Sequence, residues 1–300
     1  METPTPSRYI WGRDMLEDEY KCSLHTVAGQ RCTTVNPPTI ECPTYLKIQS
    51  LGVAAEAHLP HHLALASRDY ASRKALDLLL ANPSDINRAM IPALYYQLRQ
   101  EEDALDFIAE EFQFPNKTKA ETYSLLTTQR PSVEQAMSMA GAGPAGLTYA
   151  AIVTLIKMNR FRDLETIRQS YPHMLFPEMP VSNMDSVGKP VTAEEVVEAK
   201  KDFDTFLTAV LMWQPEFWPE LLQDILSFHH AREDYIAGDP TAIEHWEQDA
   251  VSPRAPLISP CSWAFPAWWA ASAPAPVSSA EFLLHVLVEE YGFHFQHAQS

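Results

Sequence analysis

Apolar residues recur every three or four positions over much of the chain, which is the spacing of an amphipathic helix. Between residues 61 and 112 the pattern predicts a helix that stops at Asn82-Pro83, a second that runs to about Arg99, and a third that follows it. Proline lacks the backbone donor that a helical turn needs, so Pro92 either kinks or restarts the second helix. The short turns predict an antiparallel hairpin.

The same periodicity continues in the middle of the chain. Residues 147–159 and 161–171 predict two helices joined by a short turn, and residues 131–139 before them also favour a helix. The pattern therefore predicts a second hairpin. Two hairpins indicate a solenoid of stacked helix pairs, although the sequence has no fixed repeat period.

Capping residues mark the longest helix of the C-terminal part. Thr192 and Glu195 have the spacing of a capping box, in which each side chain bonds the backbone N–H of the other residue. The helix that they open ends at Gln214-Pro215. Further helices are predicted at residues 217–228, in a short segment that starts at Asp239, and at residues 279–291.

These elements predict an all-α fold of antiparallel helical hairpins stacked in an irregular α-superhelix, with an irregular N-terminal segment. The predicted regions are an irregular N-terminal segment at 1–58, a helical-hairpin region at 59–175, a Pro-rich linker at 176–191, and a C-terminal helical region with a Pro/Trp-rich arm at 192–300.

Composition narrows the classes of function. The formal net charge is −17, which repels nucleic acid. The N-terminus lacks the apolar core of a signal peptide and cysteines are few, so we expect the cytoplasm or the nucleus. The longest uncharged stretch, residues 255–280, contains five prolines, so no membrane span is expected.

A glycine motif is the sharpest candidate for cofactor chemistry. Gly141, Gly143 and Gly146 form a complete GxGxxG, which resembles the phosphate-binding turn of FAD- and NAD-dependent enzymes. Such a turn must follow a strand, whereas the residues before this one favour a helix. We interpret it as a Gly-rich loop entering a helix, with dinucleotide binding as the less favoured alternative. A strand ending near Met139 would contradict this interpretation.

Four residues near the N-terminus are candidate zinc ligands: Cys22, His25, Cys32 and Cys42. Structural zinc sites usually take closely paired ligands, and only Cys22 and His25 have that spacing. Buried free thiols are therefore the favoured interpretation, zinc is the alternative, and the overall prediction is that no cofactor is bound.

Aromatic and imidazole side chains supply the remaining candidates. Trp263, Trp268 and Trp269 belong to an arm that either lines a pocket or partner groove, or packs on its own core, which we favour. His229 and His230 lie among carboxylates, where metal binding or acid–base chemistry is the alternative to simple solvation.

Several segments resemble a group of uncharacterised fungal proteins, some members of which carry MYND-type zinc fingers. The matching segments are residues 9–14 (YIWGRD), 42–46 (CPTYL), 61–66 (HHLALA), 90–107 and 149–158. The resemblance spans most of residues 9–245 and implies a helical region without an assigned activity. The paired cysteines of a MYND finger are missing here, so metal binding does not carry over.

The leading hypothesis is a non-catalytic helical scaffold or regulatory protein that binds another protein, because stacked hairpins readily supply binding grooves. The alternative is an enzyme or accessory protein of fungal small-molecule, or secondary, metabolism. Its ligand would bind in a dry pocket near the Trp-rich arm, or as a nucleotide at the GAGPAG loop of residues 141–146. Whether the chain is an enzyme stays open at this stage.

Overall fold

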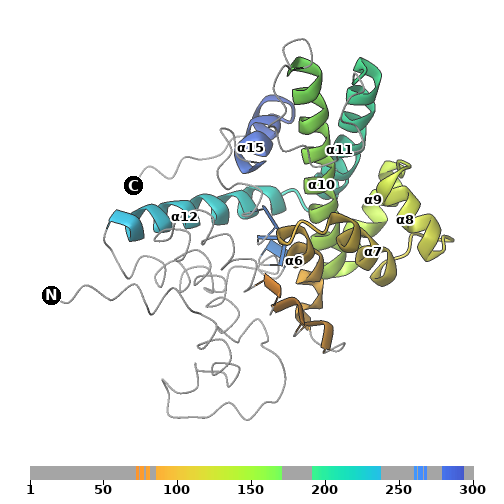
Figure 1. Cartoon of the computed structure of the whole chain (residues 1–300), viewed down its shortest axis with the longest axis horizontal. Helices are drawn as coiled ribbons and strands as arrows, with labels where there is room; N and C mark the ends of the chain where they lie inside the picture. Colours follow the sequence, from red (N-terminus) through yellow and green to blue (C-terminus); the bar gives the residue numbers. More distant parts are fainter. Residues whose placement is uncertain are drawn as a thin grey trace.

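A computed structural model describes residues 72–81, 86–170, 191–237, 260–268 and 279–293, apart from Lys74, Leu78, Ser262 and Pro266 within them. Every regular element in these ranges is a helix and none is a strand, which confirms the all-α prediction (Figure 1). The predicted N-terminal segment, residues 176–190 of the predicted linker, and the short helix expected from Asp239 lie outside the described residues.

The first predicted hairpin is present. A 3₁₀ turn, η1 (Ile86–Met90), leads into α6 (Ile91–Gln97), and α6 packs against α7 (Glu101–Glu111). Pro92 stands at the start of α6, where its missing N–H is no loss, so it restarts the helix rather than kinking it. The exposed residues of α7 are all acidic, and its apolar residues are buried.

The turn between α6 and α7 holds Arg99 in the left-handed region, with φ 60°. The Arg99 and Gln100 N–H groups donate to the carbonyls of Tyr96 and Tyr95, each at 2.9 Å, and so satisfy the end of α6. Glycine usually occupies such a position because a Cβ is strained there. We expect Arg99→Gly to raise the free energy of unfolding in urea by about 1 kcal/mol.

Asn116 provides the control for this prediction. It also has a left-handed backbone, with φ 59°. Asparagine tolerates that region better than arginine, so Asn116→Gly should gain clearly less. An equal or larger gain at Asn116 would show that backbone strain is not what limits stability at Arg99.

Two capped helices follow. In α8 (Lys119–Thr127) the capping box joins Thr118 and Glu121, and in α9 (Val133–Ala140) it joins Ser132 and Gln135. Helix α9 confirms the helix predicted at 131–139 and replaces the strand that a dinucleotide-binding turn requires. Helix α8 was not predicted, although its T-x-x-E signal stands in the sequence.

The predicted second hairpin is wrong. Residues 147–171 were expected to form two helices with a turn near Asn159, but α10 (Gly143–Ser170) is one continuous helix of 28 residues. The supposed turn contains no Gly or Pro to stop a helix. Asn159 instead lies inside the helix, and its side chain amide forms hydrogen bonds with Tyr96 and Ser279.

Helix α11 (Ala193–Trp213) opens with the predicted capping box at Thr192 and ends before Gln214 as expected. It lies beside α10 (Figure 1). Lys157 of α10 meets Asp202 of α11, whereas Phe161, one turn later, clusters with Val196 further back along α11, so the two helices are antiparallel.

Helices α12 (Phe217–Ala237) and α15 (Ser279–Glu289) complete the described elements, and both were predicted in part or in full. One large apolar cluster joins η1, α6 to α12, residues 260–268 and α15. Its largest fully buried side chains include Trp218, Trp268, Phe203 and Phe206. None of the described helices combines the length and apolarity needed to cross a membrane.

Candidate functional site

The glycine motif forms the corner between α9 and α10, and the backbone explains each of its three glycines. Gly143 has φ +88°, which side chains other than hydrogen rarely allow. A Cβ on Gly146 would lie 2.2 Å from the Met139 carbonyl oxygen, so α10 passes directly against the end of α9 there. A Cβ on Gly141 would lie 3.1 Å from Cη2 of Trp213. A tight helical corner therefore accounts for the spacing.

The last turn of α11 places an uncommon pair of side chains in solvent beside this corner. Trp213 is 52% exposed and Met212 is 60% exposed. The Trp213 ring rests on Gly141, and the following corner residues Ala142 and Pro144 are exposed as well. We call these four residues, Met212, Trp213, Ala142 and Pro144, the Trp213 surface. All four are uncharged and apolar, and they lie where the mutually packed helices α9, α10 and α11 meet.

The stretches of sequence nearest the Trp213 surface lack Lys and Arg, which occur further along the same helices, as at Lys157 and Lys200. Neither residues 131–156 nor residues 203–231 contain Lys or Arg. Glu216 is exposed three residues after Trp213, at the start of α12. Further along α12, Glu220 and Asp224 add to burial in raising the pKa of the Cys261 thiol.

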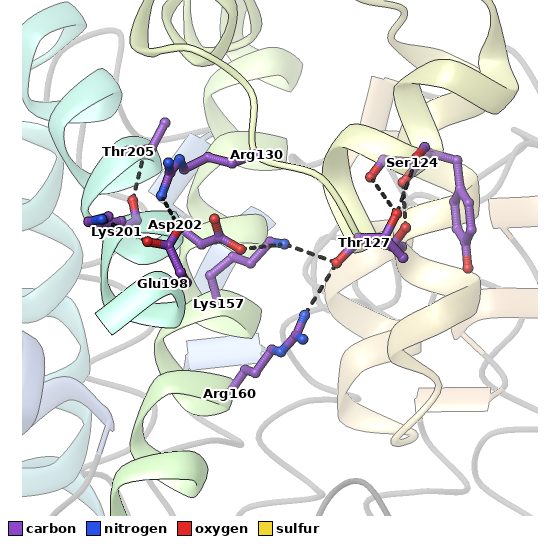
Figure 2. Close-up of polar contacts among 11 residues, drawn as sticks. Ser124, Thr127, Arg130, Lys157, Arg160, Glu198, Lys201, Asp202 and Thr205 are labelled. Carbon is purple, nitrogen blue, oxygen red and sulfur yellow. Dashed lines mark hydrogen bonds and ion pairs between the residues drawn. The ribbon is translucent and has the colours of Figure 1, made fainter. Parts of the chain in front are cut away.

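Lys157 is the most chemically suggestive buried group. Its side chain is 3% exposed, and Nζ lies 3.6 Å from Asp202 Oδ2 and 3.4 Å from the Thr127 carbonyl oxygen (Figure 2). Arg160 donates to the same carbonyl at 3.3 Å. Thr127 is the last residue of α8, so the two cations neutralise the negative end of that helix.

Burial lowers the pKa of Lys157, against the attraction of Asp202. A lowered pKa is typical of nucleophilic lysines, which attack substrate carbonyls as free amines. Such an amine must also be reachable, whereas this one is enclosed between Asp202 and Thr127. The exposed Arg130, which follows α8, pairs with Glu198 of α11 at 3.0 Å and extends this contact, while Lys201 holds Glu198 from within α11 at 2.7 Å. This arrangement joins α8, α10 and α11.

A second polar cluster connects α6, α10 and α15. Asn159 donates to the Tyr96 hydroxyl, Ser279 donates to Asn159 Oδ1 at 3.1 Å, and Arg162 donates to Ser279 Oγ at 3.3 Å. Burial raises the pKa of Tyr96, so its hydroxyl stays protonated at neutral pH. The Arg162 guanidinium also lies 5.1 Å from the centre of the Phe282 ring. This cluster fixes the start of α15 to the hairpin region.

The described tryptophans of the Pro/Trp-rich arm are buried. Trp263 and Trp268 are almost fully covered, and the Trp268 ring meets Trp218 edge-on at 5.3 Å between centroids. Trp218 Nε1 is buried without a hydrogen-bond partner in the described part of the chain. These contacts favour the interpretation that the arm packs on its own core.

The other predicted site residues are distributed as follows. His230 is exposed on α12, while the side chain of His229, and Trp269, lie outside what the structure describes. The candidate zinc ligands Cys22, His25, Cys32 and Cys42 also lie outside the described residues. Within the described ranges, His, Cys, Asp and Glu form no group of three that would hold a metal ion.

Sequence reasoning missed Lys157, Met212 and Trp213. Lys157 carried a signal, since it is the single charge in the otherwise uncharged run 135–159. Met212 and Trp213 follow the buried Val210 and Leu211 at a helix end, and the sequence alone does not tell which apolar residues there stay uncovered.

Comparison of the chain with models of protein families, with curated proteins and with solved structures gives no match. The candidate function is therefore argued from the geometry described above.

Proposed function

We propose that the chain is a non-catalytic helical scaffold that binds another protein through the Trp213 surface. The observation that carries the proposal is the half exposure of Trp213 at the rigid corner of α9, α10 and α11. Tryptophan is the residue most enriched among the side chains that dominate binding energy at protein interfaces. Apolar side chains gathered at one exposed place are typical of interaction sites.

Rigidity supports the proposal further. Helices α9, α10 and α11 pack against one another, and the absence of a side chain at Gly141 leaves room for the Trp213 ring. A side chain that is held in place loses little conformational entropy when a partner covers it. The buried polar groups serve the same framework, because Lys157 and Asn159 bond neighbouring helices.

Site-specific photo-crosslinking tests the proposal. A benzophenone amino acid replaces Met212 in one variant and Val197 in another. Val197 is a matched control, because it is 50% exposed on the same helix but lies at the other end, about 22 Å away along the axis. We expect the full-length chain in its native cell extract to form one discrete protein adduct from position 212 and none from position 197.

Identification of the adduct by mass spectrometry decides the result. A single protein that crosslinks only at position 212 agrees with the proposal, and it must then bind the purified chain. Adducts formed equally from both positions, or no adduct from position 212, would contradict a binding role for the Trp213 surface.

A further inference from the structure

Met212 differs from the other methionines that the structure describes. Met90, Met139 and Met158 are buried in the core. Met137 is partly covered where it packs against the same core. Met212, in the last turn of α11, is 60% exposed. Among the methionine thioethers in the described part of the chain, this one alone lies largely in solvent.

Exposure decides which methionine an oxidant reaches first. A hydroperoxide transfers its terminal oxygen atom to the thioether sulfur, so that an S=O bond forms and the O–O bond breaks. The sulfur loses two electrons, and the hydroperoxide is reduced to water or an alcohol. Methionine sulfoxide reductases reverse the change. Cys261 competes poorly for the oxidant, because burial raises the pKa of its thiol and leaves little reactive thiolate.

A sulfoxide at position 212 would change the Trp213 surface but not the core beneath it. The sulfoxide oxygen is polar and is solvated by water, so a partner that covers it must remove that water. Met212 lies outside the apolar core cluster, whereas the preceding residues Val210 and Leu211 belong to it. Oxidation of Met212 should therefore weaken binding at this surface without unfolding α11.

We propose that Met212 is a reversible oxidation site that controls binding at the Trp213 surface, with a hydroperoxide as the oxidant. The reduced thioether lets a partner cover Met212 and Trp213, and the sulfoxide disfavours that contact. This inference rests on the proposed function and adds its regulation. Two observations carry it together, namely the exposure of Met212 and its position next to the half-exposed Trp213.

Peptide mapping by mass spectrometry tests the chemistry without a partner. The full chain is treated with dilute hydrogen peroxide, and the addition of one oxygen atom is followed at each methionine. We expect Met212 to react at least about tenfold faster than the buried Met139 and Met158. Circular dichroism should show a folded chain when Met212 is fully oxidised. Equal rates at the three positions would overturn the inference.

Photo-crosslinking from the neighbouring corner tests the control of binding. A benzophenone amino acid replaces Pro144, which is exposed in the Trp213 surface, and Met212 stays in place. Catalase removes the peroxide before the treated chain meets its native cell extract. We expect oxidation to reduce the yield of the protein adduct roughly tenfold, and methionine sulfoxide reductase to restore it.

Met212→Leu provides the matched control, because leucine has a similar volume and is apolar but has no sulfur to oxidise. The variant keeps every other methionine and cysteine of the chain, so oxidation elsewhere affects it equally. We expect its adduct at position 144 to form in the same yield with and without peroxide. If peroxide reduced the adduct of Met212→Leu as much as that of the parent chain, oxidation at other residues would be the cause and the inference would fall.

The outcomes distinguish this inference from the proposed function. Equal adduct yields from the oxidised and the untreated chain would overturn the control by Met212, and the proposed function would stand. If the untreated chain formed no adduct from position 144 and none from position 212, the proposed function would be removed and the inference with it.

Discussion

Gly146→Ala should destabilise the fold by about 3 kcal/mol, because the added methyl group has no room at the corner of α9 and α10. The new Cβ would lie 2.2 Å from the Met139 carbonyl oxygen and 2.8 Å from the Ala142 Cβ. The first of these is a backbone atom, so relief requires the two helices to move apart. Urea denaturation followed by circular dichroism measures the loss.

The sign of this effect is diagnostic. Gly→Ala inside a helix normally stabilises by roughly 1 kcal/mol, since alanine loses less backbone entropy. A loss at Gly146 must therefore come from the packing of α10 on α9. Gly143→Ala is the comparison, because no atom lies within 4 Å of its Cβ and only its φ of +88° is unfavourable. The free energy of unfolding of Gly143→Ala should fall by about 1 kcal/mol. A stable Gly146→Ala protein would disprove the close approach.

Asp202→Asn should destabilise the protein by about 2 kcal/mol, because it leaves the buried Lys157 ammonium without its counter-ion. The pair lies between α10 and α11, with 3.6 Å between Lys157 Nζ and Asp202 Oδ2. The side chain of Asp202 is 21% exposed, so water offsets part of the loss. Thermal and urea unfolding of the purified variants measure the change.

Removing the lysine should be better tolerated than removing its partner. Lys157→Met fills the same space without a charge, and Arg160 still donates to the Thr127 carbonyl. We expect a change within about 1 kcal/mol, and we expect the double variant Lys157→Met/Asp202→Asn to recover most of the loss. If Lys157→Met proved as damaging as Asp202→Asn, the charge on Lys157 would not be the cause.

The pH dependence supplies a second readout for Lys157. Burial lowers its pKa in the folded state below the ordinary value of 10.5, so the unfolded chain holds this proton more tightly. The cost of burying the charge is fully present below the folded-state pKa, and it is relieved as pH rises from there toward 10.5. The wild-type chain should therefore gain stability relative to Lys157→Met as the pH increases through that interval.

The elements with strong local signals were predicted well from the sequence. The capping box at Thr192 and the proline after Gln214 set both ends of α11, and periodicity located α6, α7, α9 and α15. Local signals did not decide whether α10 is one helix or two. Asparagine is common at helix ends. Only the hydrogen bonds of Asn159 to the distant residues Tyr96 and Ser279 explain its place in a helix interior.

The candidate site was predictable only in part. The glycine motif was interpreted as a Gly-rich loop entering a helix, because the residues before it favour a helix. Helix α9 confirms that preceding helix, whereas Gly143 and Gly146 already belong to α10. The Trp213 surface could not be predicted, since its exposure depends on how α9, α10 and α11 end together. Trp263 and Trp268, which the sequence offered as candidate contact residues, are instead buried in the core.

The binding affinity of the partner crosslinked at position 212 tests the central claim most directly. Isothermal titration calorimetry compares the purified wild-type chain with Trp213→Ala, and with Val197→Ala as the control of equal exposure on the same helix. An interface tryptophan of this kind contributes about 2 kcal/mol, so Trp213→Ala should weaken binding roughly thirtyfold while Val197→Ala leaves it unchanged. Equal affinity of the wild-type and Trp213→Ala chains would contradict the account.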